Sequence, residues 1–136
     1  MKKYQKGLVI LCVASALVIG NVTPAQASTA TSRNDDITVT LTTGVASNVR
    51  SGTSTVTLRR ARPGVRARVH TRRSGGTLVN STWAQASGTT AFGTGTRIVR
   101  GPVSWAEGVT FRAHGQIQTS VGGAWVSQVT TDPVQR

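Results

Sequence analysis

The sequence is short of the residues that most often carry covalent and metal chemistry. Its 136 residues include one cysteine, Cys12, and only four acids against 16 lysines and arginines. A single cysteine excludes a disulfide scaffold and a zinc ribbon. The two histidines, His70 and His114, are too few for a three-ligand metal centre unless carboxylates complete it. We therefore expect no metal and no cofactor.

The chain also lacks the short motifs of common enzyme families. It contains no G-x-S-x-G, H-E-x-x-H, phosphate-binding P-loop or EF-hand pattern. Its length fits one domain rather than two. These absences predict a single domain that is not an enzyme.

The first 27 residues have the three parts of a secretory signal peptide. Three lysines come first, and an apolar stretch of 14 residues follows at 7–20. That stretch is short of the ~20 residues that a membrane-spanning helix needs. Ala25-Gln26-Ala27 then gives a small-x-small cleavage signal. We expect cleavage after Ala27 and a secreted, extracellular chain without a transmembrane segment; an uncleaved membrane anchor is the alternative.

Cleavage would remove the only cysteine and every lysine. The remaining residues, 28–136, hold 13 arginines and four acids, a charge of 13 − 4 = +9. Without a disulfide, stability must come from packing and hydrogen bonds. The arginine-only set fits codon bias in a GC-rich genome, which we favour, or selection for planar guanidinium donors.

After residue 27 the sequence alternates with the period of two that is typical of β-strands. Threonine and serine supply 31 of these 109 residues, and valine dominates the apolar set. Turns are indicated by Asn48 to Thr53, Pro63-Gly64, Ser74-Gly75-Gly76 and Gly122-Gly123. We expect strands at about 37–43, 54–60, 65–71, 77–85, 96–100, 109–119 and 124–131, with 88–95 as a loop or bulged strand.

These seven or eight short strands predict an all-β fold. The spacing favours a small antiparallel β-sandwich, immunoglobulin-like in strand count, with a small barrel as the alternative. The sandwich would cover 37–131, after a flexible N-terminal segment at 28–36 and before a C-terminal tail at 132–136. The tryptophans at 83, 105 and 125 are expected to supply most of the large core volume, with ligand stacking as the other possible role.

The densest signal is a group of arginines in the middle of the chain. Alternation on 65–71 would turn Val65, Ala67 and Val69 inward and the basic residues between them outward. If 54–60 and 65–71 form a hairpin around Pro63-Gly64, Arg59 lies opposite Arg66. The four acids, at 35, 36, 107 and 132, are distant in sequence. The predicted polyanion-binding residues are Arg59, Arg60, Arg62, Arg66, Arg68, Arg72 and Arg73.

Repulsion among these arginines is tolerated either because water and salt screen it or because the face meets a polyanion. We expect a secreted, non-catalytic domain that binds an anionic cell-envelope polymer or an anionic membrane surface. Sequence-specific nucleic-acid binding is not expected, because aromatics do not alternate with the arginines. One alternative is an exported antimicrobial or toxin that acts on membranes. Another is a small secreted nuclease with Glu107 as base and His114 as acid.

Overall fold

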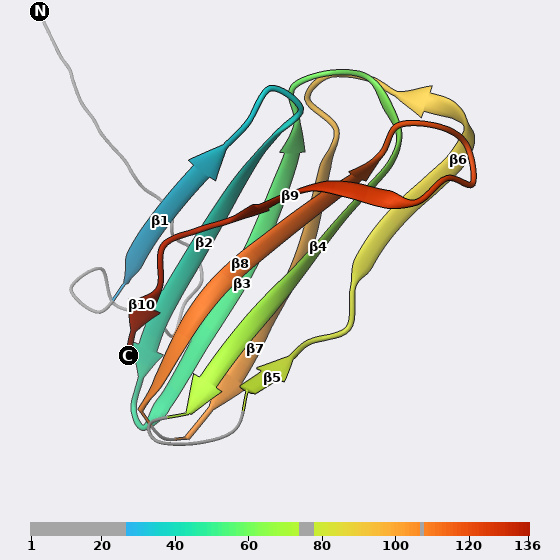
Figure 1. Ribbon diagram of the computed structural model, residues 1–136. Helices are drawn as coiled ribbons and strands as arrows, with labels where there is room; N and C mark the ends of the chain where they lie inside the picture. The colour runs from blue at the N-terminus through green and yellow to red at the C-terminus, as the bar shows by residue number, and fades with distance from the viewer. Residues whose placement is uncertain (1–26, 74–77, 107) are drawn as a thin grey trace, which may run out of the picture.

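The computed structural model describes residues 27–73, 78–106 and 108–136. These residues form an all-β structure of ten strands in two antiparallel sheets (Figure 1). None of the described segments is a helix long and apolar enough to cross a membrane. The predicted signal peptide up to residue 26, the predicted turn at 74–76 and Glu107 lie outside the described residues.

Two sheets divide the ten strands between them. The first sheet has the order β1-β2-β3-β7 and consists of β1 (Ser28–Arg33), β2 (Ile37–Ala46), β3 (Val49–Leu58) and β7 (Arg97–Trp105). The second is built around the pair β4 (Arg62–Arg73) and β8 (Val109–Gln118). On the β4 side lie β5 (Leu78–Asn80) and β6 (Ala84–Phe92). On the β8 side lie β9 (Trp125–Thr130) and β10 (Val134–Gln135).

The core lies between the two sheets, and the period-two pattern of the sequence explains it. Every second residue of a strand points to the same face, so one row per strand turns inward. The first sheet buries Ile37, Val39, Leu41, Val56 and Leu58. The second buries Val65, Ala67, Val69, Val109, Phe111, Ala113, Ile117 and Val129. The all-β prediction is confirmed, and the arrangement is sandwich-like.

The tryptophans do not supply the core volume, contrary to the sequence-based expectation. Trp83, Trp105 and Trp125 are all only half-buried, and Trp105 alone of the three packs against the edge of the core. The largest fully buried side chain is Phe111. Isoleucine, leucine and valine side chains follow it in size and fill most of the remaining space between the sheets.

Both ends of the domain are longer than predicted. Residues 28–33 form β1, which pairs with β2 from Ser28↔Thr43 to Arg33↔Thr38, so the prediction of a flexible segment is wrong there. The predicted C-terminal tail contains β10, and Val109 and Arg136 exchange two backbone hydrogen bonds of 2.8 Å. The backbone N–H and C=O groups of these ends form hydrogen bonds with the neighbouring strands β2 and β8. Apolar periodicity does not predict such backbone pairing. In Figure 1, β1 and β10 lie on the same side of the molecule.

The middle of the chain also departs from prediction. The strand expected at 77–85 is broken at 81–83, where Trp83 leaves the ladder. Of the two alternatives for 88–95, a loop or a bulged strand, the structure has the strand as far as Phe92: β6 covers 84–92, and its pairing with β4 has a register shift. β7 continues past Gly101-Pro102 to Trp105. The first predicted turn shrinks to Ser47 and Asn48, where Ser47 takes a left-handed φ of 55°.

Candidate functional site

The predicted arginine hairpin does not form. β3 pairs with β2 and β7 in the first sheet, whereas β4 pairs with β5, β6 and β8 in the second. Residues 59–61 therefore cross from one sheet to the other, and Arg59 is not opposite Arg66. Pro63 and Gly64 are buried inside β4 rather than in a turn. Crossing between sheets buries Leu58 and Val65 as well as a hairpin would, so the apolar pattern is the same for both arrangements.

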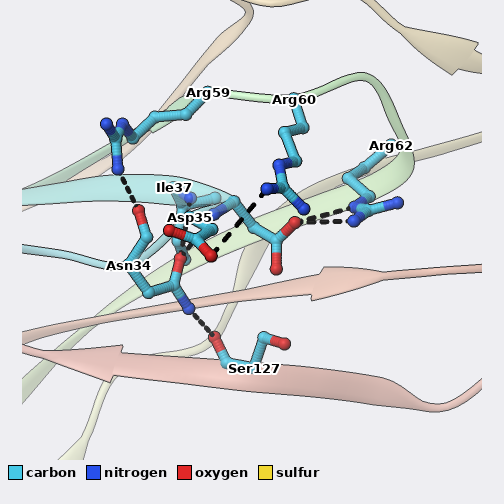
Figure 2. A network of polar contacts seen from close by, with 8 residues as sticks. Asn34, Asp35, Ile37, Arg59, Arg60, Arg62 and Ser127 are labelled. Atoms are coloured by element: carbon cyan, nitrogen blue, oxygen red, sulfur yellow. Dashed lines mark hydrogen bonds and ion pairs between the residues drawn. The ribbon is translucent and has the colours of Figure 1, made fainter.

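At the crossing, three of the seven predicted arginines meet the turn between β1 and β2 (Figure 2). Arg62 donates from Nε and Nη2 to Oδ1 of Asp36, at 3.0 and 2.7 Å. Arg60 lies 3.8 Å from Asp35, and Arg59 donates to the carbonyl oxygen of Asn34. The expectation that no acid offsets these arginines is thus wrong at this end. The sequence could not show it, because the carboxylates approach only when the two sheets pack.

Asp36→Ala is expected to lower the free energy of unfolding by about 2 kcal/mol. The two side chains are 14% and 25% exposed, so the variant leaves a largely desolvated guanidinium on Arg62 without its carboxylate. Asp35→Ala is the matched control, because its ion pair with Arg60 is 58% and 85% exposed and should contribute under about 0.5 kcal/mol. Urea unfolding of both variants measures the difference; equal losses would contradict the assignment.

The outer surface of β4 and β8 carries a second group of basic side chains. The register pairs Arg66 with Gln116, Arg68 with His114, and His70 with Arg112. Cross-strand partners share a face of the sheet, so these side chains lie on the side opposite the core. The predicted alternation on β4 is confirmed by the full burial of Val65, Ala67 and Val69. We call this surface the basic face; it consists of Arg66, Arg68, His70, Arg72, Arg112, His114 and Gln116.

The last predicted arginine, Arg73, does not belong to the basic face. It follows Arg72 on β4 and therefore points to the other side of the sheet. Its guanidinium carbon lies 5.5 Å from the ring centroid of Trp105, at the end of β7 in the first sheet. The seven predicted residues are thus in three places, with only Arg66, Arg68 and Arg72 on the basic face.

Two tryptophans join the basic face from opposite sides of the β4–β8 pair. The guanidinium carbon of Arg66 lies 4.1 Å from the ring centroid of Trp83 and 4.4 Å from that of Trp125. That of Arg68 lies 4.4 Å from Trp83. The contacts form a column in the order Trp125, Arg66, Trp83, Arg68, which we call the Trp–Arg column. Such cation–π contacts hold a guanidinium in place without neutralising it.

Local hydrogen bonds position this column. Ser81 pins the segment that carries Trp83, since its Oγ accepts from the Val69 amide and its own amide donates to the Val69 carbonyl, both at 2.8 Å. Trp125 begins β9 opposite Gln118 of β8. Arg66 donates from Nε and Nη2 to Oε1 of Gln116, the Nε bond being 2.9 Å long. The planar guanidinium of Arg66 is therefore fixed by its edge and by its faces.

Two histidines lie side by side among these arginines, with ring centroids 5.0 Å apart. Burial lowers the pKa of His114 to about 4, helped by the charges of Arg68, His70 and Arg112. Burial also lowers the pKa of His70; its hydrogen bond to Asn80 opposes this, and the charges of Arg112, Arg68 and Arg72 add to it. Both rings are therefore neutral near pH 7, and arginines alone carry the charge of the basic face.

No carboxylate of the described ranges offsets that charge. Within 27–73, 78–106 and 108–136 the ion pairs are Arg60–Asp35 and Arg62–Asp36, both at the crossing. Arg72 and Arg112 are exposed. Burial lowers the pKa of Arg66, and the neighbouring charge of Arg68 lowers it further. Four like charges on one sheet face are thus left for solvent or a ligand to compensate.

Sequence reasoning missed three members of this surface. Arg112 joins it through the pairing of β4 with β8. Trp83 joins it from the segment between β5 and β6, and Trp125 joins it from the start of β9. Alternation on 109–119 did turn Arg112 and His114 away from the core, but no local signal says which strand lies beside which. Among the described residues there is no group of three or more potential metal ligands.

The fold and this surface together define an all-β domain of two antiparallel sheets, one of which carries an arginine face joined by tryptophans and without a carboxylate partner among the described residues. No protein-family model, curated protein or solved structure matches the chain.

Proposed function

We propose that this is a secreted, non-catalytic β-sandwich domain that binds an anionic polymer or surface outside the cell, after removal of residues 1–27. The observation that carries the proposal is the set of four arginines on one sheet face without a carboxylate partner among the described residues. The binding residues are accordingly revised from the seven predicted ones to Arg66, Arg68, Arg72 and Arg112.

The spacing of these arginines suits a repeating anion. Residues two apart on a strand repeat every ~6.6 Å, and Arg112 adds a position on the neighbouring strand. Guanidinium groups bind phosphate, sulfate or carboxylate oxygens through parallel hydrogen bonds. Binding of this kind releases counterions and weakens steeply as the salt concentration rises.

The state of His114 on the basic face fits a binding role better than a catalytic one. The nuclease alternative needs His114 as a general acid, which must carry a proton at the working pH. His114 has a pKa of about 4, and its Nδ1 accepts a hydrogen bond from Nε of Arg68 at 3.1 Å. It is therefore a neutral acceptor near pH 7. Its expected partner, Glu107, lies outside the described residues.

The double variant Arg72→Gln/Arg112→Gln tests the proposal. Both side chains are exposed, so the fold should be unaffected. At 50 mM salt we expect affinity for long-chain polyphosphate to fall about tenfold and the slope of log K against log[salt] to fall by about 1 to 2. Fluorescence anisotropy with labelled polyphosphate measures both quantities.

Arg33→Gln/Arg97→Gln is the matched control, because it removes the same charge from exposed positions on the first sheet. It should change affinity less than threefold. If the two double variants lose affinity equally, net charge rather than the basic face is responsible. If the unmodified protein does not bind polyphosphate even at 50 mM salt, the proposed function is wrong.

A further inference from the structure

Trp125 is the last ring of the Trp–Arg column. Among the described residues its ring meets one guanidinium, that of Arg66, whereas Trp83 meets two. One face of the Trp125 indole is therefore not covered by a cation, and the side chain is only half-buried. Tryptophan usually buries its large apolar surface. An indole left at the end of a stacked column on a charged surface offers a place for another planar ring.

Positive charge continues from this ring along the sheet. Trp125 lies opposite Gln118, and Arg112 is six residues earlier on the same strand, β8. At the rise of a β-strand this separation is about 20 Å. Arg66, Arg68 and Arg72 follow the same direction on β4. A ligand that uses both ends must therefore be an extended chain with planar rings and repeated negative charges.

We propose that the anionic polymer is single-stranded nucleic acid, bound without sequence preference, with one base stacked on Trp125 and phosphates held by Arg68, Arg72 and Arg112. This inference rests on the proposed function and names its ligand class. Bases of every kind present a π-face, so stacking on an indole tolerates any sequence, and a basic surface follows the backbone. Arginine donors further suit phosphate oxygens.

The arrangement of donors supports the assignment of phosphate contacts. Arg68 uses only Nε in its hydrogen bond to His114, so both of its Nη nitrogens remain for a ligand among the described contacts. Arg66, in contrast, spends two donors on Gln116 and lies between two rings. Arg66 therefore adds its charge to the basic face and holds the column together, but it has fewer donors left for a phosphate. Arg68, Arg72 and Arg112 are the donors free to reach successive phosphates.

The experiment compares two ligands of equal charge. One is an eight-nucleotide deoxythymidine oligomer, and the other is an abasic eight-mer with the same sugar–phosphate backbone. Fluorescence anisotropy at 50 mM salt should show the thymidine oligomer binding about tenfold more tightly. Trp125→Leu should bring the affinity for the thymidine oligomer down to that of the same variant for the abasic oligomer. Trp125→Phe keeps a flat ring and should restore part of the preference.

Failures of the two proposals are distinguishable. Equal affinity for the two oligomers, unaffected by Trp125→Leu, would overturn base stacking and leave anion binding standing. Tighter binding of dextran sulfate than of the thymidine oligomer, lost in Trp125→Leu, would assign the surface to a sulfated polysaccharide and overturn the nucleic-acid inference. If the unmodified protein binds neither oligomer nor polyphosphate, both proposals are wrong. If Trp125→Leu alters the circular dichroism spectrum, the comparison uses the unmodified protein and Trp125→Phe instead. A preference for the thymidine oligomer in both supports base stacking, and equal affinity for the two oligomers in both contradicts it.

Discussion

Replacing Phe111 with alanine is expected to lower the free energy of unfolding by about 4 kcal/mol. Phe111 is the largest fully buried side chain and is 0% exposed. It extends from β8 into a core made otherwise of aliphatic side chains, so its removal loses transfer free energy and leaves a cavity. Small domains have total stabilities of only about 5–15 kcal/mol, so the variant should lose a large share of its stability. The midpoint of urea unfolding measures the loss.

Gly52 on β3 provides the control, because it faces the ring across the two sheets. A Cβ atom at Gly52 would lie 2.6 Å from Cδ1 of Phe111, well inside contact distance. Gly52→Ala should therefore cost about 2 kcal/mol in the unmodified protein through overpacking. In the Phe111→Ala background the same methyl group would enter the cavity and should be neutral or stabilising. Additive losses in the double variant would show that the glycine does not make room for the ring.

This pair explains why the tryptophans were wrongly predicted to be in the core. Facing sheets are ~10 Å apart, and valine, leucine and isoleucine side chains fill most of that space. A large ring fits where the opposite strand has a glycine, as at Gly52 opposite Phe111. The sequence shows that Phe111 points inward, because alternation is local. It does not show which residue of another sheet will face a given position.

Because the sequence does not show which strands lie beside one another, only part of the basic face could be predicted. The outward direction of Arg66, Arg68 and Arg72 follows from alternation with buried valines and was correct. The position of Arg62 beside Asp36 and of Arg112 beside His70 depends on strand pairing and sheet packing. Pro63-Gly64 was interpreted as a turn, but its local conformational preference was overridden by burial within β4. Local pattern thus predicts which face a side chain occupies, and tertiary pairing decides its neighbours.

Stability is expected to fall by about 3 kcal/mol as the pH is lowered from 6.5 to 4, because of His114. Its pKa is about 4 in the folded protein against an ordinary value of 6.5, so in this window the unfolded chain binds a proton that the folded chain does not. The stabilising effect is complete above pH 6.5 and is lost as the pH falls toward 4. One pKa unit corresponds to about 1.4 kcal/mol, which sets the steepest slope per pH unit. The lowered pKa of His70 acts in the same direction.

The hydrogen bond between Arg68 and His114 gives an independent reason for this low pKa. Nε of Arg68 donates to Nδ1 of His114, so Nδ1 must be unprotonated and the ring must carry its hydrogen on Nε2. If Nδ1 were protonated, its N–H would face the Nε–H of Arg68, and two donors would be opposed in a largely buried site. His114→Gln keeps an acceptor for Arg68 and removes the titration. Urea unfolding at pH 4, 5, 6 and 7 should therefore show a flatter profile for this variant than for the unmodified protein.

His70→Gln is the matched control for that profile. The His70 ring lies 5.0 Å from that of His114, tilted by 34°, but it is half-buried and hydrogen-bonded to Asn80, so its replacement should leave most of the pH dependence in place. The acidic residues are the same in all three proteins, so their contribution to the pH profile cancels in the comparison. An unchanged slope in His114→Gln would mean that His114 protonates freely in the folded state. The basic face would then gain a positive charge on mild acidification, and the neutral-acceptor role assigned to His114 would be wrong.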